Sequence, residues 1–253
     1  MNIKVAQCWD DGVATDIRLI EILRKYHAKA TFNLCPGLMP DERIEPHWNK
    51  PDGRNWSING FTGGRVGKNE LVKIYGGFQV ASHCWKHETP TYVTDAEFIK
   101  GAVDARNFLE DLFQRECHGF AWPGGRHTPE TEKMLADAGF KYGRTTANVA
   151  DITACTNLVT LDPNCHFMNH SFWKIFDAAK TTGVFYFWGH SYEMMDCPNY
   201  WERFELMIKT FSEDPDVEWV DVIDLIPLCR GANKLALCAR NHLKKSIESE
   251  KLG

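Results

Sequence analysis

The chain has 253 residues and a formal net charge of −5, with acidic and basic residues interspersed, so the composition gives no reason to expect a nucleic-acid partner. It contains no run of about 18 apolar residues, so we expect neither a membrane-spanning segment nor a membrane partner. Nine cysteines without a Cys-x-x-Cys pair argue against a disulfide framework or thiolate zinc site, and no signal-peptide pattern follows Met1. We therefore expect a cytoplasmic protein.

Short apolar runs alternate with amphipathic stretches along the chain, which is the pattern of βα units built on a parallel sheet. Strands are expected at Ile3–Trp9, Ala30–Leu34, Phe78–Ser82, Gly119–Trp122, Tyr142–Thr145, Leu158–Leu161, Val184–Trp188 and Glu218–Val222. Helices are expected at Asp16–His27, Lys68–Tyr75, Asp95–Phe113, Pro129–Ala138, Ser171–Lys180, Tyr200–Phe211 and Ala232–Ile247.

This order predicts an α/β fold in which seven or eight parallel strands, each followed by a helix, close into a (β/α) barrel. No glycine-rich phosphate loop follows the first strand, which disfavours an open nucleotide-binding sheet. No repeat or linker divides the chain, so residues 1–253 are expected to form a single domain.

The stretch Pro36–Lys68 interrupts the alternation with six glycines and four prolines, and we expect a long inserted loop there. It carries the aromatic residues Trp48, Trp56 and Phe61. These rings could stack on a sugar, or they could fasten the loop to the body of the protein.

Reactive groups in a parallel α/β barrel gather where the strands end, because the loops at those ends converge on one face. Four such strand ends in this sequence carry polar or glycine-rich segments, namely Asp10-Asp11, His83 with His87, Pro123-Gly124-Gly125, and His190. Two of these segments have a plainer interpretation: Asp10-Asp11-Gly12 can cap a helix, and His190 can bond the backbone at the end of a strand.

The spacing His83-x-x-x-His87 places two imidazoles one helical turn apart, as two ligands of one metal ion would be. A second pair, His166-x-x-x-His170, has the same spacing. We favour the first pair because a buried strand leads into it. Together with Asp11, two histidines form a donor set that suits Zn²⁺ or a similar divalent ion and leaves positions open for water and substrate.

The ordered segments resemble the motifs of the polysaccharide deacetylase family, also called the NodB-homology domain. The resemblance runs from about residue 3 to residue 225. It rests on Cys8-Trp9-Asp10-Asp11-Gly12, Ala30-Thr31-Phe32, Ser82-His83-Cys84-Trp85-Lys86-His87, Phe120-Ala121-Trp122-Pro123-Gly124-Gly125 and the strand that leads into Gly189-His190.

The resemblance implies a distorted (β/α) barrel that removes an acyl group, such as acetyl, from an N-acylated sugar or related amide. It implies Asp10 as general base and His190 as general acid. A divalent cation, with zinc as the expected ion, would be held by Asp11, His83 and His87. The segment Trp122, Pro123 and Gly124 would border the substrate, with the Gly124 N–H helping to hold the oxyanion.

Two positions depart from the family pattern. The third motif usually has an arginine before its proline, but residues 118–123 contain none and Arg126 follows instead. The aspartate of the fourth motif has only Asp162 as a candidate. Two other functions also stay open. Some relatives of this fold hydrolyse cyclic amides or ureides without a metal, and the absence of an export signal favours such a small substrate; the other alternative is an inactive carbohydrate-binding protein.

Overall fold

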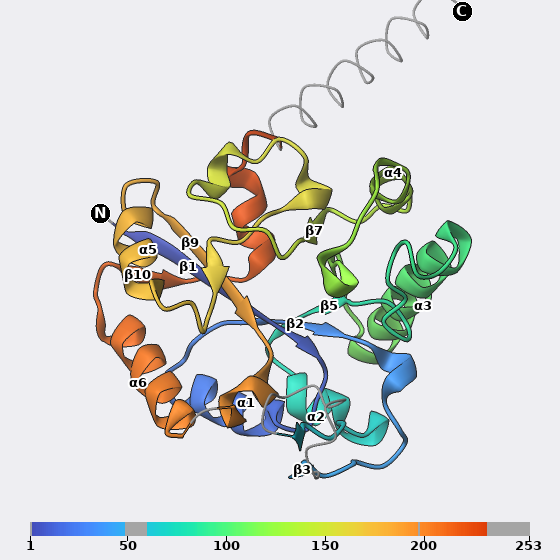
Figure 1. Cartoon of the computed structure of the whole chain (residues 1–253), viewed down its shortest axis with the longest axis horizontal. Helices are drawn as coiled ribbons and strands as arrows, with labels where there is room; N and C mark the ends of the chain where they lie inside the picture. The colour runs from blue at the N-terminus through green and yellow to red at the C-terminus, as the bar shows by residue number, and fades with distance from the viewer. Residues whose placement is uncertain (1, 49–59, 197, 232–253) are drawn as a thin grey trace, which may run out of the picture.

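The computed structural model describes residues 2–48, 60–196 and 198–231. Its main feature is an eight-stranded sheet, in which every pairing between strands is parallel, with six α-helices arranged around it (Figure 1). The strands are β1 (Ile3–Asp11), β2 (Thr31–Leu34), β5 (Gln79–Ser82), β6 (Gly119–Ala121), β7 (Tyr142–Arg144), β8 (Cys165–His166), β9 (Val184–Gly189) and β10 (Val217–Trp219). The helices are α1 (Asp16–Lys25), α2 (Leu71–Tyr75), α3 (Asp95–Phe113), α4 (Pro129–Asp137), α5 (Phe172–Ala179) and α6 (Tyr200–Glu213).

The strand order is β7-β6-β5-β2-β1-β9-β8, with β10 paired to the beginning of β1. The sheet curls into a half-barrel, and within the described residues no strand pairing joins β8 back to β7. This architecture confirms the predicted α/β fold and its distorted barrel.

Alternation along β1 separates two environments, because successive side chains of a strand point to opposite faces. Ile3, Val5 and Trp9 pack in the outer layer with residues of the surrounding helices. Ala6 and Cys8 pack in a second cluster with residues of other strands, among them Tyr142 of β7 and Tyr186 of β9. The same alternation places Asp10 on the side of Ala6 and Cys8, toward the interior of the half-barrel.

Most predicted elements agree with the structure to within a few residues, and α3 begins and ends at the predicted residues. The expected strand Leu158–Leu161 is wrong, because Leu158–Thr160 forms a 3-10 turn. The Thr160 N–H and hydroxyl both donate to the Asn157 carbonyl, at 3.0 and 3.2 Å, and this local bonding competes with strand pairing. Only Leu161 makes a bridge to the sheet, at Arg144.

The stretch predicted as an inserted loop contains a short antiparallel hairpin of β3 (His47–Trp48) and β4 (Phe61–Thr62). Trp48 is 56% exposed and packs on Phe61, with the ring centroids 5.2 Å apart. Phe61 is buried against Val13 and Tyr192, so it fastens the loop to the body of the protein. Trp56 and the expected helix Ala232–Ile247 lie outside the described residues. None of the helices in the described ranges combines the length and apolar character that a membrane span requires.

Candidate active site

Two adjacent carboxylates end β1, and both are buried, with 2% of Asp10 and 1% of Asp11 exposed. Asp10 points into the half-barrel, whereas the backbone turns at Asp11, which has a φ of 82°. A short polar side chain such as aspartate tolerates this left-handed conformation better than most residues. Gly12 continues the turn with a φ of 68°. The two carboxyl groups therefore face different partners.

His83 and His87 lie in the loop that follows β5. The loop is not helical, so the predicted explanation of their proximity by one helical turn is wrong. It is folded instead by left-handed residues, Cys84 with a φ of 64° and His87 with a φ of 61°. The imidazole centroids are 4.8 Å apart, with the rings at 84° to each other. The pair converges as the spacing predicted, through a different backbone conformation.

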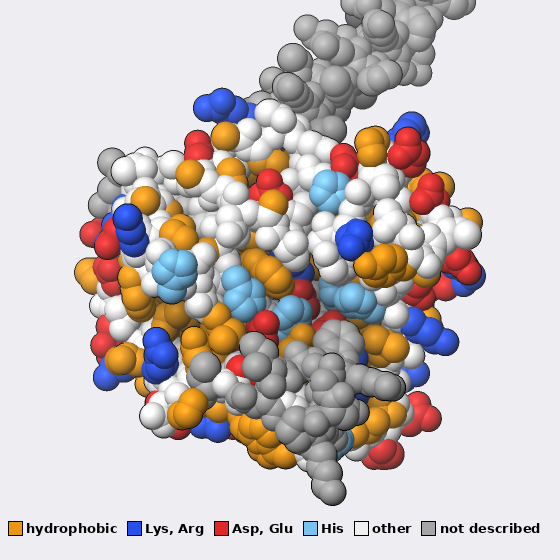
Figure 2. Space-filling model, viewed as in Figure 1, with side chains coloured by type: hydrophobic (Ala, Val, Ile, Leu, Met, Phe, Trp, Pro, Cys, Tyr) orange, Lys and Arg blue, Asp and Glu red, His pale blue; other side chains and the backbone are white. Residues whose placement is uncertain are grey.

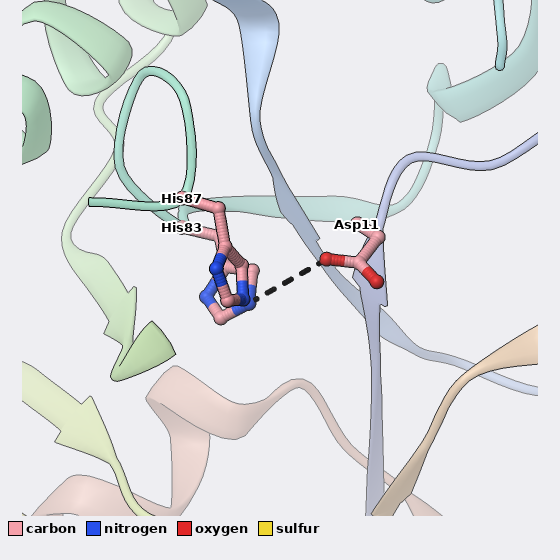
Figure 3. Close-up of side chains that lie close together, drawn as sticks. All are labelled: Asp11, His83 and His87. Atoms are coloured by element: carbon pink, nitrogen blue, oxygen red, sulfur yellow. Dashed lines mark ion pairs between the residues drawn. The ribbon is translucent and has the colours of Figure 1, made fainter. Parts of the chain in front are cut away.

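Asp11, His83 and His87 bring one potential ligand atom each to within 4.8 Å of one another. Figure 3 shows both imidazoles on one side of this group, facing the Asp11 carboxylate. His83 Nδ1 lies 2.8 Å from the Ala121 carbonyl oxygen, to which it donates, so its Nε2 carries a lone pair. That Nε2 lies 3.8 Å from Asp11 Oδ1.

The arrangement around Asp11 fits a cation. Burial, as the largest effect, lowers the pKa of His83 to about 4, so this imidazole is neutral near pH 7. Asp11 Oδ1 is buried and has no hydrogen-bond partner among the described residues. A carboxylate oxygen and an imidazole lone pair that face each other without a proton between them repel, and a bound divalent ion would remove both that repulsion and the unmet hydrogen-bonding capacity.

Asp10 lies in a network of positive and hydrogen-bonding groups. Asn33 Nδ2 donates to its Oδ1 at 2.7 Å, and the fully buried Arg144 donates to its Oδ2. Burial alone would raise the pKa of Asp10, but Arg144, followed by His83 and His190, outweighs burial and holds the pKa well below its usual range. Asp10 is therefore ionised at neutral pH.

His190 follows β9 and faces Asp10, with its Nε2 3.8 Å from Asp10 Oδ2. On its other side, Nδ1 forms an ion pair with Glu193 Oε2 at 3.2 Å, and the same oxygen accepts the His190 backbone N–H at 2.9 Å. Burial opposes the imidazolium, but Glu193, followed by Asp11 and Asp10, raises the pKa of His190 to about 9. His190 is therefore protonated at neutral pH.

A buried carboxyl group fastens the segment that carries His190. Ser191 Oγ donates to Asp16 Oδ1, and the Tyr75 hydroxyl donates to Asp16 Oδ2 at 2.7 Å. Thr15 Oγ1 lies 2.7 Å from Ser191 Oγ. The residue after His190 is thereby bonded to the first turn of α1, which limits where the imidazole can point.

The segment Trp122, Pro123 and Gly124 divides between core and surface. The Trp122 side chain is completely buried, stacks on Phe98 at 5.2 Å and donates from Nε1 to the Val159 carbonyl at 2.6 Å. Its ring thus lies in the core. Pro123 is also buried, whereas Gly124 is exposed with a φ of 60°. A Cβ at Gly124 would lie 3.7 Å from Thr89, so Gly124 borders the loop that carries His87.

Two charged partners in the site, Arg144 and Glu193, were not predicted from the sequence. Arg126 and Asp162, the two candidates for the missing motif residues, do not contact Asp10 or His190 in these ways. Arg126 is exposed and stacks on Tyr92 at 4.7 Å, and Asp162 accepts a hydrogen bond from Thr145. A usable signal existed for Arg144, because it is an arginine at the C-terminal end of a predicted barrel strand, where functional groups gather.

The second histidine pair does not converge. His166 Nε2 lies 3.0 Å from Glu193 Oε2, so this residue belongs to the surroundings of His190. His170 instead lines a separate cavity of about 470 Å³ between α5 and α6. Figure 2 shows histidine side chains gathered across the middle of one face of the molecule, next to acidic groups.

Comparisons with known proteins agree with the fold described above. The chain resembles the solved structure of a Mycobacterium smegmatis protein assigned to the polysaccharide deacetylases, with a TM-score of 0.60 and 15% identity over 92% of each chain. It resembles a family 4 carbohydrate esterase from Streptomyces lividans in complex with acetate, with a TM-score of 0.54 and 15% identity over 85% of this chain and 91% of that one. It also resembles a family 4 acetyl xylan esterase from Clostridium thermocellum in complex with a cobalt ion, with a TM-score of 0.51 and 16% identity over 89% of this chain and 91% of that one. These likenesses show the fold.

The alignment with a Streptococcus pyogenes deacetylase covers 61% of that chain and 61% of this one, at 20% identity and a TM-score of 0.48. Curated protein sequences include no match to this chain. The family model for polysaccharide deacetylase matches residues 2–143, a segment that contains Asp10, Asp11, His83 and His87. Since this match covers more than half of the sequence, the chain belongs to the polysaccharide deacetylase family.

Proposed function

We propose that this protein is a divalent-metal-dependent hydrolase that removes an acetyl group from the nitrogen of an N-acetylated sugar. The observation that carries the proposal is the convergence of Asp11, His83 and His87 around one point, with Asp11 Oδ1 buried and without a hydrogen-bond partner in the described structure. Asp10 and His190 lie beside this group with opposite charges. Membership of the family supports the class of reaction.

The three ligands would hold the ion, with Zn²⁺ as the expected species for one carboxylate and two imidazoles. A bound divalent ion would lower the pKa of a water molecule and polarise the acyl carbonyl. The imidazole of His83 is held ready for this role, because its Nδ1 is fixed on the Ala121 carbonyl and its Nε2 faces Asp11.

Asp10 is suited to accept a proton from the attacking water. It is ionised at neutral pH, and Asn33 and Arg144 fix its two oxygens in place. Because its low pKa makes Asp10 a weak base, it can accept a proton only from a water molecule whose own pKa has been lowered.

His190 is suited to donate a proton to the leaving amine. It carries the proton at neutral pH, and its Nε2 points toward Asp10 while Glu193 holds Nδ1. An amine leaves poorly without a proton, so a charged imidazolium at this position favours amide cleavage. The backbone N–H of Gly124 is our candidate for contact with the developing oxyanion.

A carbohydrate substrate is supported by the aromatic residues next to His190. Tyr192 stacks on the His190 ring, with centroids 5.0 Å apart, and Phe61 packs against Tyr192. Phe61 in turn supports exposed Trp48. We propose that Trp48 offers a flat surface to a sugar ring near the reacting bond. The seven described cysteines are free thiols, which supports a location in a reducing, intracellular compartment.

The proposal is tested with purified protein on N-acetylated chito-oligosaccharides, on O-acetylated xylan and on a cyclic ureide. We expect acetate release from the N-acetylated sugar, its loss after chelation and its return on addition of Zn²⁺ or Co²⁺. Elemental analysis should show about one ion per chain, and a variant of Asp11 should lose it.

Other outcomes would select a different function. Full activity of the metal-free protein on the cyclic ureide would support the metal-independent hydrolase. Faster release from O-acetylated xylan would reassign the protein as an esterase. Binding of oligosaccharide without release of acetate at any metal concentration would identify an inactive carbohydrate-binding protein.

A further inference from the structure

His166 lies next to the charged pair of Glu193 and His190, although neither the family pattern nor the predicted elements suggested a role for it. It belongs to β8, a two-residue strand that the sequence did not predict. The pairing of β8 with β9 sets His166 opposite Trp188, two residues before His190. The strand therefore holds His166 beside Glu193 and His190.

The hydrogen bonds of His166 define which of its nitrogen atoms carries the proton. Its Nδ1 accepts the backbone N–H of Met168 at 3.2 Å, so this nitrogen has the lone pair. The proton of the neutral ring is then on Nε2, which lies 3.0 Å from Glu193 Oε2 and donates to it. Trp188 packs edge-on against the ring, with centroids 4.6 Å apart, and fixes its plane.

Glu193 Oε2 thus has three partners: it accepts hydrogen bonds from His166 Nε2–H and from the His190 backbone N–H, and it forms an ion pair with the His190 imidazolium. The first is the only one of the three that does not come from residue 190. Among the described residues, Glu193 Oε2 would without this bond contact only His190, the residue that it is meant to orient.

We propose that His166 is a positioning residue that fixes Glu193, so that Glu193 in turn keeps His190 directed at the leaving group. This inference rests on the proposed function. The same three side chains bring ligand atoms within 4.8 Å of one another and could be taken for a second metal site. The bond from Met168 to His166 Nδ1 argues against that assignment, since it keeps the proton on the nitrogen that faces Glu193.

The test compares His166→Phe, which removes the donor, with His166→Gln, whose amide can replace the Nε2–H. Each variant is assayed on an N-acetylated chito-oligosaccharide and on 4-nitrophenyl acetate, whose leaving group needs no proton. We expect His166→Phe to lower kcat on the amide about 10-fold or more, a part of what a general acid contributes. We expect the ester rate to change less than about 3-fold, and His166→Gln to restore most of the amide rate.

His170→Gln is the matched control, because His170 lines a separate cavity, and it should change neither rate. Circular dichroism and thermal melts check that each variant is folded. Equal losses on amide and ester, or no loss on either, would overturn the role of His166 while the proposed function stands. If His166→Phe lost one equivalent of bound zinc, His166 would be a ligand of a second metal site and not a positioning residue. A wild-type enzyme that does not cleave the amide would overturn the proposed function, and this role with it.

Discussion

Arg144 and Asp10 form a buried ion pair although 134 positions separate them in the sequence and the strands β6, β5 and β2 lie between their own strands in the sheet. Both side chains point into the half-barrel, so the pair reaches across its interior. The arginine that pairs with Asp10 therefore belongs to β7, whereas residues 118–123 of the third motif contain no arginine.

Replacement of Arg144 by methionine should destabilise the protein by about 3–5 kcal/mol at pH 7, because it leaves the Asp10 carboxylate buried without its cation. This loss of stability should shrink at acidic pH, because in the variant burial is no longer opposed by Arg144 and favours the protonated form of Asp10. Urea unfolding at several pH values measures this. The double variant with Asp10→Asn should recover much of the stability, and an equal loss in the double variant would contradict the explanation.

Glu193→Gln should lower the pKa of His190. In the wild type this pKa is raised from 6.5 to about 9, so the protonated ring stabilises the fold. That contribution is fully present below pH 6.5 and is lost as the pH rises through about 9. The metal-free wild type should therefore lose stability over this interval, and Glu193→Gln should not. An unchanged NMR titration of His190 in the variant would contradict the assignment.

Asp11→Asn should weaken zinc binding by more than about 100-fold, since even groups that only support a ligand contribute 10-fold to 100-fold. The same variant should make the metal-free protein more stable, because it removes a buried carboxylate oxygen that lacks a hydrogen-bond partner in the described residues. Calorimetric titration and thermal melts without metal measure the two effects. His170→Gln, which changes a histidine outside the group, should alter neither.

Trp122→Phe distinguishes a core residue from a substrate contact. It removes the hydrogen bond from Nε1 to the Val159 carbonyl and should cost about 1–3 kcal/mol of stability. Because the ring is buried among Phe98 and Phe120, KM and kcat should stay within about twofold of the wild type. A large increase in KM without loss of stability would place Trp122 against the substrate instead.

The sequence predicted the parts of the site that depend on short-range order. Asp10 and Asp11 end a strongly apolar strand, and His83 and His87 are close in the sequence, so any compact loop after β5 brings the two imidazoles near each other. The rule that strand ends converge on one face then brings the two segments together. These inferences needed only the location of the strands.

The partners that set the charges could not be predicted in the same way. The contact between Arg144 and Asp10 depends on the curvature of the sheet, which no local pattern encodes. Glu193 and His166 meet through β8, and a strand of two residues has no measurable alternation of polar and apolar side chains. The family pattern also directed attention to Arg126 and Asp162, which contact Tyr92 and Thr145 instead.

Two of the three expected metal ligands, Asp11 and His87, have backbones in the left-handed region, with φ of 82° and 61°. This conformation costs an ordinary residue about 1–2 kcal/mol, which the surrounding packing must offset. A framework held in this way has little freedom to widen, so it should discriminate among cations by size and ligand preference. Small ions that accept nitrogen donors should bind, whereas calcium, which requires six or more oxygens, should be excluded.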